Sequence, residues 1–456
     1  MKIEEIVLSQ REYFNTDVTK SVSFRKEALK KLYSAIVANE TTILQALKKD
    51  LNKSNFEGYM TEIGMVRDEC RHAIRHVSSW AKPKRVRTPF AQFHSQSYIL
   101  KDPYGVALIM SPWNYPFQLT MAPLIGAIAA GNCAVIKPSA YTPATSQVIA
   151  DMISSRFPAE YITVVQGGRK ENTALLDIHF DYIFFTGSTT VGKLVMEKAS
   201  RFLTPISLEL GGKSPAIIDE TADLKIAATR LAWAKFLNAG QTCVSPDYVL
   251  IHESRKEEFI EELRKAIDKA FPQGALKDKE YVHIVNEKQF TRLSAFLNNG
   301  KTVIGGGTDP TIRCIEPTVL DNINFDSPVM QEEIFGPIFP ILTYKNLDEA
   351  IQILRKKPKP LALYFFTKSK TNREKVFSSL SFGGGCVNDA IIHLATSEMG
   401  FGGVGESGMG SYHGKKSFDT FTHEKSIVDK KTWIDLPMRY RPYTKRNYKL
   451  IRMFLK

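Results

Sequence analysis

The chain has 456 residues, of which 43% are apolar and 24% are charged. This length and composition are typical of a globular protein of roughly three domains, and they exclude wholesale disorder and fibrous structure. The formal net charge is +13, yet residues 430–456 hold nine basic residues and one acidic residue, so most of the excess lies in the tail. The nearly balanced remainder argues against a nucleic-acid enzyme, which would spread a basic groove through its domains.

The five cysteines are odd in number, scattered and never spaced as Cys-x-x-Cys, which indicates reduced thiols rather than a disulfide framework. The first residues, Met1–Ser9, include Glu4 and Glu5 and lack the basic-then-apolar pattern of a signal peptide. Prolines and polar residues interrupt the longest apolar region, Val106–Ile136, so no segment is predicted to span a membrane. Together these features predict a cytoplasmic protein.

Residues 1–84 are predicted to be largely helical. Their apolar residues recur near helical spacing, for example at Leu29, Leu32 and Ile36. A basic, proline-containing stretch follows and leads into residues 85–103, which are expected to form an exposed connector or arm.

From Gly105 onward, short apolar runs alternate with helical stretches. The runs predicted as strands are Val106–Met110, Ala134–Ile136, Ile162–Val165 and Tyr182–Phe185. Such alternation favours βαβ units and a parallel sheet, in which ligands bind beyond the carboxyl ends of the strands. This rule selects Asn114, Lys137 and Gly187 as candidate ligand-binding residues.

The region after Gly211 repeats the alternation, with a helix predicted near residues 223–237 and a strand at 248–251. Ser254 and Glu257 are predicted to cap a further helix. The sequence therefore predicts an α/β protein with two Rossmann-like, open-sheet domains.

The loop Gly187-Ser-Thr-Thr-Val-Gly-Lys193 follows an apolar strand and precedes a helix, a position in which a helix N-terminus binds phosphate. It also matches most of a Walker A loop, but Leu194 replaces the hydroxyl residue that would hold magnesium. Asp219, in a Walker-B-like run, keeps a P-loop nucleotidase open as an alternative. The other interpretations are a dinucleotide phosphate site and a plain tight turn.

Cys243 follows Gly240 in a segment predicted to be an irregular turn. A lone cysteine is more often a buried apolar residue than a nucleophile. Two other residues favour chemistry here: Glu209 is a candidate base beside a glycine pair, and Asn114 offers an amide donor between two prolines. A nucleophile, a base and an oxyanion donor are what attack on a carbonyl needs, provided that the fold brings them together.

Seven short motifs along the chain resemble those of the aldehyde dehydrogenase family, in particular its dimeric class of fatty and aromatic aldehyde enzymes. The motifs are Pro112–Pro116, Lys137–Ser139, Phe185–Ser188, Glu209–Lys213, Gly240–Cys243, Glu332–Pro337 and Gly402–Gly408. The resemblance covers nearly the whole chain. It implies NAD(P)-dependent oxidation of an aldehyde, either medium- or long-chain aliphatic or aromatic, to the carboxylic acid.

The resemblance also implies the catalytic roles. Cys243 would be the nucleophile that forms a thiohemiacetal and then a thioester with the substrate. Asn114 and the backbone N–H of Cys243 would bind the oxyanion, and losing one such donor typically costs ~10²–10³ in rate. Glu209 would activate a water molecule to release the acid.

By the same resemblance, the cofactor is NAD or NADP. Lys137 is expected at the adenosine ribose, and Gly187 and Ser188 at the cofactor's phosphates. Glu333 is expected at the nicotinamide ribose and Phe335 near the nicotinamide ring. Without the family pattern, a solvated surface acid would be the favoured interpretation of Glu333.

Tyr115, Trp233 and Ile391 match family positions at an apolar aldehyde channel, although such residues are more often plain core. The family commonly has an acidic residue at position 140, which bonds the adenosine ribose and repels a 2′-phosphate. This chain has Ala140 instead. We therefore predict that NADP is accepted alongside NAD.

Three rival functions stay open. A CoA-acylating or phosphorylating relative would pass the thioester to another acceptor and would not need Glu209 as a hydrolytic base. A P-loop nucleotidase would hydrolyse ATP or GTP, and a non-enzymatic relative would bind cofactor without turnover. No metal site is predicted, because His72 and His76 lie beside arginines and not in a His-Glu-x-x-His motif.

An NAD(P)-binding domain is expected over residues 1–84 and 104–209, and a catalytic domain over residues 210–410. An arm is expected over residues 85–103 and 411–430, and a tail over residues 431–456. The family resemblance implies that the arm forms a homodimer. The basic, aromatic tail is compatible with docking at an anionic membrane surface. Packing on the protein itself or on a partner subunit is favoured, because the tail is too short and polar to span a bilayer.

Overall fold

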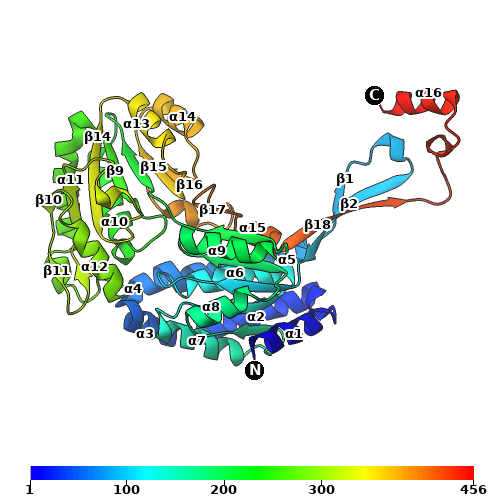
Figure 1. The fold of residues 1–456 in the computed structure, drawn as a ribbon, viewed down its shortest axis with the longest axis horizontal. Helices are drawn as coiled ribbons and strands as arrows, with labels where there is room; N and C mark the ends of the chain where they lie inside the picture. The colour runs from blue at the N-terminus through cyan, green and yellow to red at the C-terminus, as the bar shows by residue number, and fades with distance from the viewer. Residues whose placement is uncertain (1, 456) are drawn as a thin grey trace.

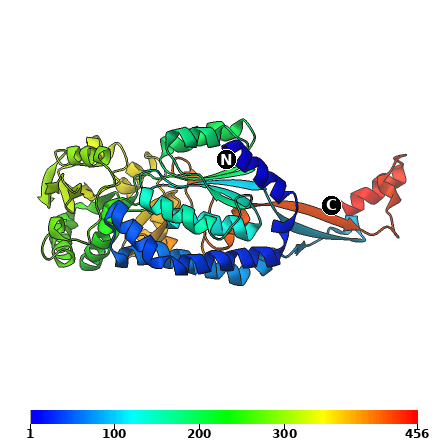
Figure 2. The ribbon, with the colours of Figure 1, turned by 90° about the horizontal axis from the view of Figure 1, so that it is seen from below.

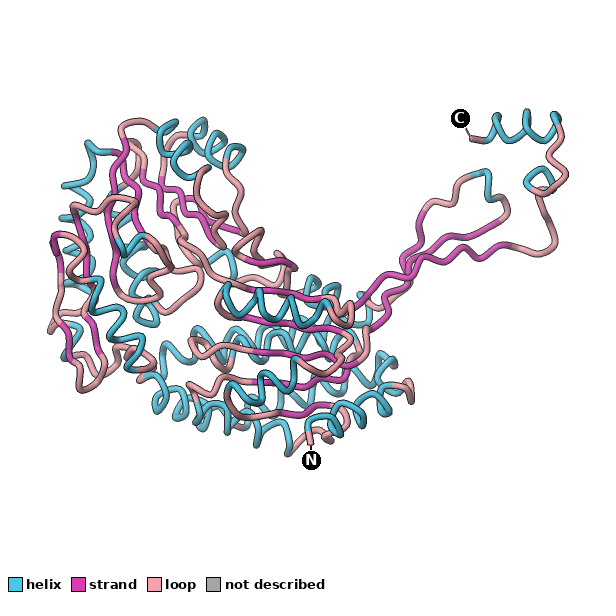
Figure 3. Tube along the Cα trace, viewed as in Figure 1, coloured by secondary structure: helices cyan, strands magenta, loops and turns pink. Residues whose placement is uncertain are grey.

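The computed structural model describes residues 2–455, which form two α/β lobes and an arm that extends away from both (Figure 1). The first lobe is built on a six-stranded sheet and the second on a seven-stranded sheet. A three-stranded sheet forms the arm, which leads to a terminal helix (Figure 3). The predicted fold class, two open-sheet domains with a small arm, is confirmed.

The first sheet has the order β17-β7-β6-β3-β4-β5 and is parallel except for the edge strand β17. Its strands are β3 (Val106–Met110), β4 (Cys133–Lys137), β5 (Ile162–Val164), β6 (Tyr182–Thr186), β7 (Ile206–Glu209) and β17 (Gly408–Met409). Helices cover both faces of this sheet (Figure 2). This double cover explains why the central strands occur in the sequence as continuous apolar runs.

The helices of the first lobe come from both ends of the chain. They are α1 (Ile3–Phe14), α2 (Val22–Ala38), α3 (Glu40–Leu51), α4 (Asn55–Gly58), α5 (Gly64–Trp80), α6 (Gln118–Ala130), α7 (Pro143–Ser154), α8 (Arg169–Leu176), α9 (Thr189–Ser200) and α15 (Lys415–Thr420). A π turn, η2 (Tyr59–Ile63), joins α4 to α5. Every residue of α6 is buried, in keeping with a helix that is apolar on all sides.

The second sheet has the order β10-β13-β14-β9-β8-β15-β16 and is parallel except for β10. Its strands are β8 (Pro215–Ile218), β9 (Tyr248–His252), β10 (Lys301–Ile304), β13 (Thr318–Asp321), β14 (Ile338–Tyr344), β15 (Ala362–Phe366) and β16 (Gly384–Val387). A short hairpin joins β11 (Thr308–Asp309) to β12 (Cys314–Ile315). The helices are α10 (Leu224–Phe236), α11 (Lys256–Ala270), α12 (Glu287–Phe296), α13 (Leu347–Arg355) and α14 (Lys370–Ser379).

The arm consists of β1 (Lys84–Val86), β2 (Ser95–Pro103) and β18 (Thr422–Lys430), all antiparallel. Beyond it lies α16 (Lys445–Phe454), where the Phe454 ring packs on Phe90 of the arm with 5.6 Å between centroids. The tail therefore contacts the arm of its own chain. Among residues 2–455, no helix is both long and apolar enough to cross a membrane.

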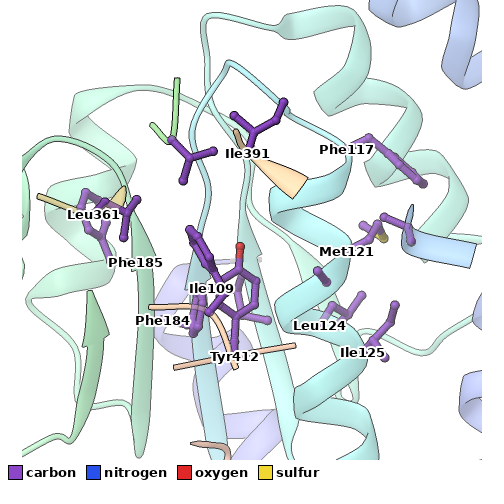
Figure 4. Packing of buried hydrophobic residues seen from close by; sticks show 14 of the residues in the cluster. Ile109, Phe117, Met121, Leu124, Ile125, Phe184, Phe185, Leu361, Ile391 and Tyr412 are labelled. Atoms are coloured by element: carbon purple, nitrogen blue, oxygen red, sulfur yellow. The ribbon is translucent and has the colours of Figure 1, made fainter. Parts of the chain in front are cut away.

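A buried apolar cluster surrounds β3 and α6 and reaches the junction of the lobes (Figure 4). In it the Tyr412 ring meets Phe184 edge to face, with 5.1 Å between centroids. Tyr412 comes from the segment that follows the second lobe, so this contact ties the returning chain to the first sheet.

Two local expectations differ from the structure. Ser254 and Glu257 do not cap α11, because a 3₁₀ turn precedes the helix and the Ser254 hydroxyl instead bonds to Nδ1 of His252 at 2.8 Å. The sequence-based prediction assigns residues 408–410 to the catalytic domain and residues 411–420 to the arm. In the structure β17 joins the first sheet, and α15 approaches α6 so closely that a Cβ at Gly126 would lie 2.7 Å from Ser417 Cβ.

Candidate active site

Cys243 lies in a tight loop at the junction of the two lobes, just after α10. The backbone passes through the left-handed region at Asn238, Ala239 and Gly240, with φ of 54°, 51° and 73°. Gly240 is required there for a second reason, since a Cβ would overlap the carbonyl oxygen of Gly336. The motifs Gly240–Cys243 and Glu332–Pro337 thus meet by direct backbone contact, which fixes the loop.

Gln241 holds this loop from within. Its buried amide donates to the carbonyl oxygens of Asn238 and His283, both at 3.1 Å, and its Oε1 accepts from Val285 N at 3.1 Å. Because these bonds are buried, breaking them would leave polar groups without partners. The loop therefore holds Cys243 in one place.

The structure brings Asn114 to this loop from the first lobe. Its Nδ2 donates to the carbonyl oxygen of Gln241 at 3.0 Å, two residues before Cys243. The next residue, Tyr115, bonds through its hydroxyl to Thr242 Oγ1 at 2.6 Å. The predicted oxyanion donor and the predicted nucleophile are therefore on neighbouring, directly bonded loops.

Glu209 ends β7, and its carbonyl oxygen accepts from Gly187 N at 3.0 Å, which joins β7 to the loop that follows β6. The Glu209 side chain is only 2% exposed, and neither of its carboxyl oxygens has a hydrogen-bond partner among the described residues. Burial therefore raises the pKa of this carboxyl group well above its ordinary value. Such a group is neutral at rest, and it becomes a proton acceptor only after it has lost its own proton.

The Cys243 thiol is held in its neutral form. Burial raises its pKa to about 12, and the nearby carboxyl groups of Glu333 and Glu209 add to the effect. The thiolate is the reactive form, so a resting thiol of this kind is weakly nucleophilic until its surroundings change.

A cavity of about 170 Å³ opens beside Cys243. Tyr115, Trp233 and Ile391 all line it, so the structure brings the three predicted channel residues together. Its further apolar lining residues include Met60, Met65, Leu119, Leu237, Leu394 and Phe401. An apolar wall with few polar groups suits a hydrocarbon or aromatic substrate tail.

Three of the predicted cofactor residues lie at the carboxyl ends of strands in the first sheet. Lys137 ends β4 and is buried, its Nζ donates to the Pro138 carbonyl oxygen at 2.7 Å, and burial lowers its pKa to about 8. Gly187 and Ser188 follow β6, and Ser188 Oγ accepts from Val191 N at the start of α9. This is the arrangement in which a helix N-terminus receives a phosphate group.

Glu333 faces the first lobe from the second. Its carboxyl group occupies the space that a Cβ at Gly211 would need, and burial raises its pKa to about 8. Asp247 fixes the segment by accepting from Ile334 N at 2.9 Å, and Lys213 donates to the Glu332 carbonyl oxygen at 2.8 Å. Glu333 is therefore a positioned, half-buried group and not a solvated surface acid.

Phe335 lies close to the first lobe, with φ of 52° and its ring 5.4 Å from Trp113 in an edge-to-face contact. A cavity of about 370 Å³ runs beside Gly211, Glu333 and Thr189. The glycine pair, the helix N-terminus and the facing carboxyl group fit a dinucleotide that extends between the lobes.

The Walker-type alternative has no geometric support. Asp219 follows β8 in the second sheet, whereas the Gly187 loop follows β6 in the first. Both Asp219 oxygens are occupied, by Thr221 and by Thr367 with Asn372. Across residues 2–455, no three His, Cys, Asp or Glu side chains gather as a metal-ligand group.

A sequence profile described as the aldehyde dehydrogenase family matches residues 1–427. The chain belongs to this family. It is 50% identical, over 100% of its length and 99% of the relative, to 4,4′-diaponeurosporen-aldehyde dehydrogenase of Staphylococcus aureus. It is 42% identical to the rat dimeric NADP-preferring aldehyde dehydrogenase, over 94% of each chain.

Comparison with solved structures supports the same family. A substrate-bound state of Staphylococcus aureus AldH matches with a TM-score of 0.98 and 50% identity over 100% of both chains. An indole-3-acetaldehyde dehydrogenase in complex with NAD⁺ matches with a TM-score of 0.86 and 26% identity, over 94% of this chain and 88% of that one. The family assignment and the fold are confirmed, and with them NAD(P)-dependent aldehyde oxidation.

Several residues of the site give no signal in the sequence. Met60 and Leu237 line the aldehyde cavity, but they look like ordinary apolar residues of predicted helices. Tyr412 and His413 also line it, although they follow the last recognisable motif. Only tertiary structure shows that these distant segments meet.

The backbone contact at Gly240 gives a first prediction. Gly240→Ala adds a left-handed strain of ~1–2 kcal/mol and a clash with Gly336, which overpacks the loop by a further ~1–3 kcal/mol. We expect a large loss of stability in urea unfolding and a fall in kcat. Gly405→Ala is the control, because Gly405 has φ of 66° and, among the described residues, only the flexible Lys359 side chain lies near its Cβ position, with Cδ at 3.7 Å. Equal losses in the two variants would contradict the role of the Gly336 contact.

Proposed function

We propose that Cys243 attacks the aldehyde carbon in the apolar cavity, with Asn114 as an oxyanion donor. The observation that carries this proposal is the 3.0 Å bond between Asn114 Nδ2 and the Gln241 carbonyl oxygen beside the cysteine. An amide nitrogen has two hydrogens, and this bond uses one of them. The second hydrogen, with the N–H of Cys243, is available to the oxygen of the thiohemiacetal.

Bound NAD(P) would supply the hydride acceptor that oxidation of the thiohemiacetal needs. We propose that Lys137, Gly187 and Ser188 bind its adenosine and phosphate half, while Glu333 and Phe335 position the nicotinamide half. The group left on the enzyme is a thioester of Cys243.

Glu209 is proposed as the base that hydrolyses this thioester. Water attacks the acyl carbon, Glu209 accepts its proton, and the sulfur of Cys243 leaves. One aldehyde, one water and one oxidised cofactor thus give one acid, one reduced cofactor and one proton. A base works best when its pKa lies near the operating pH, and burial moves the pKa of Glu209 upward in that direction. A CoA-acylating or phosphorylating enzyme would not need a base that activates water.

The substrate is proposed to be a medium- or long-chain aliphatic or aromatic aldehyde. The 170 Å³ cavity is apolar, and it shares Met60, Trp233 and Leu237 with a larger cavity of about 520 Å³. A long tail could therefore continue past Trp233 without leaving the protein surface. The name of the Staphylococcus aureus relative, 4,4′-diaponeurosporen-aldehyde dehydrogenase, supports an aldehyde substrate here as well.

A panel of n-alkanals and aromatic aldehydes tests this function through the absorbance of the reduced cofactor. We expect kcat/KM to rise with chain length, because each buried CH₂ contributes ~0.8 kcal/mol. Cys243→Ala should abolish turnover, and Glu209→Gln should give a single-turnover burst followed by slow release. In the wild type, release should slow as the pH falls through the raised pKa of Glu209, because only the carboxylate accepts a proton.

Two outcomes would contradict these roles. Full steady-state turnover by Glu209→Gln, with an unchanged pH profile of release, would remove Glu209 as the base. Faster turnover on addition of coenzyme A or phosphate would favour the acylating rival. Mass spectrometry of quenched enzyme provides a direct control, since the acyl adduct should be found on Cys243 and on none of the other cysteines.

Cofactor choice gives a separate prediction. The structure places Ala140 in an exposed position three residues after Lys137, where no carboxylate of its own repels a 2′-phosphate. We expect NADP to be used alongside NAD, with values of kcat/KM within a hundredfold, or about 2.7 kcal/mol. The measurement compares both cofactors with one aldehyde. Ala140→Glu is the matched variant and should shift preference toward NAD, whereas a larger NAD preference in the wild type would contradict the prediction.

We propose that the arm forms a homodimer, which the name of the rat relative, a dimeric enzyme, supports. The contact of Phe454 with Phe90 supports packing of the tail on the arm. The alternative is peripheral contact with an anionic membrane, for which α16 offers basic residues and the exposed Tyr448.

Sedimentation with liposomes separates the two roles of the tail. We expect the full chain and a variant truncated after Lys430 to bind equally weakly to anionic and neutral vesicles. Binding of the full chain alone, and only to anionic vesicles, would establish the membrane contact instead. Light scattering of the same samples measures the oligomeric state and should give a dimer mass for the full chain.

A further inference from the structure

A buried ion pair lies behind the loop that carries Asn114. Lys53 Nζ and Glu62 Oε1 are 2.6 Å apart, and both side chains have no exposed surface. Burying two charges is costly, and the pair is usually no more stabilising than an apolar pair of the same size. Its presence directly behind the site therefore calls for an explanation other than stability.

Lys53 contacts the Asn114 loop directly. Its ammonium group donates to the Asn114 carbonyl oxygen at 3.2 Å and lies 4.2 Å from the centre of the Tyr115 ring. The same carbonyl oxygen also accepts from Asn238 Nδ2 at 2.9 Å, in the cysteine loop. One cation thus fixes the backbone of the residue whose side chain is the proposed oxyanion donor.

Glu62 holds the other end of the same loop. Its Oε2 accepts from the backbone N–H groups of Phe117 and Gln118, at 2.8 Å and 3.2 Å. These residues begin α6, where free N–H groups and the helix dipole favour a negative charge. Lys53 and Glu62 therefore hold both ends of the five residues from Asn114 to Gln118.

The short segment that supplies the pair also reaches the cysteine loop. Glu57 Oε1 accepts from Asn238 N at 2.9 Å. Glu57 and Glu62 are five residues apart across the π turn η2, and i→i+5 turns of this kind are frequent at functional sites. Residues 53–62 thus contact, from one side, both the loop that carries Asn114 and the loop that carries Cys243.

We propose that Lys53 and Glu62 are positioning residues that set the Asn114 amide against the thiohemiacetal oxygen. The inference rests on the proposed role of Asn114. Neither residue lines the 170 Å³ aldehyde cavity, so their effect on the reaction passes through the loop and not through substrate contact. A displacement of the amide by a fraction of an ångström would weaken the oxyanion bond without removing it.

The test is a double-mutant cycle on the burst rate of reduced-cofactor formation in a single turnover. Lys53→Met/Glu62→Gln removes both charges of the pair, and the glutamine oxygen can still accept from Phe117 N. We expect this variant to lose tenfold or more in burst rate, with KM for the cofactor within twofold of the wild type. Asn114→Ala alone should lose ~10²–10³. Combining all three changes should be no more than twofold slower than Asn114→Ala, because the pair acts through Asn114.

Glu62→Gln alone is the second variant, since it keeps every side-chain volume and removes only the negative charge. It leaves the buried Lys53 charge without its partner, so we expect a lower melting temperature together with a burst defect of the same kind. Lys256→Met is the control, because Lys256 pairs with the half-buried Asp321 at 3.0 Å in the second lobe, and among the described residues its ion pairs reach only Asp321 and Glu257. Its burst rate should equal that of the wild type, and circular dichroism and thermal melting check folding throughout.

The outcomes separate the positioning role of Lys53 and Glu62 from the oxyanion role of Asn114. A normal burst rate in folded Lys53→Met/Glu62→Gln and Glu62→Gln, or losses that multiply with that of Asn114→Ala, would overturn the positioning role and leave the proposed chemistry intact. A normal burst rate in Asn114→Ala would overturn the oxyanion role, and the positioning role with it.

Discussion

The active site depends on hydrogen bonds that cross between the lobes, first among them the bond from Asn114 Nδ2 to the Gln241 carbonyl oxygen. Asn114 follows a strand of the first sheet, and Gln241 belongs to a loop of the second lobe. Neither lobe alone contains both the proposed nucleophile and the proposed oxyanion donor. The chemistry therefore requires that the two lobes be held in one relative position, and the core around β3 and α6 contributes to that packing.

Burial sets the resting state of the reactive groups. The site contains a thiol whose pKa is raised to about 12 and a carboxyl group with no hydrogen-bond partner among the described residues. The low-dielectric surroundings favour the neutral form of both groups. In the proposed mechanism, the loss of these protons accompanies the arrival of substrate and water, which restricts the reactive thiolate to the occupied site.

Much of this arrangement can be predicted from the sequence. Parallel strands are evident as apolar runs, and the rule that ligands bind at their carboxyl ends selects Asn114, Lys137 and Gly187. The pairing of Asn114 with the cysteine loop cannot be predicted, because it joins residues 127 positions apart. Lys53 and Glu62 give no signal at all, since lysine and glutamate in a helical region normally indicate a solvated surface.

The arm has a mechanical consequence. Strand β2 leads through Gly105 into β3 at the centre of the first sheet, while β18 follows directly on α15, which packs against α6. Both long strands of the arm are therefore rooted in the same lobe. A partner that binds the arm is therefore coupled directly to the first lobe, and to the second lobe only through the contacts between the lobes.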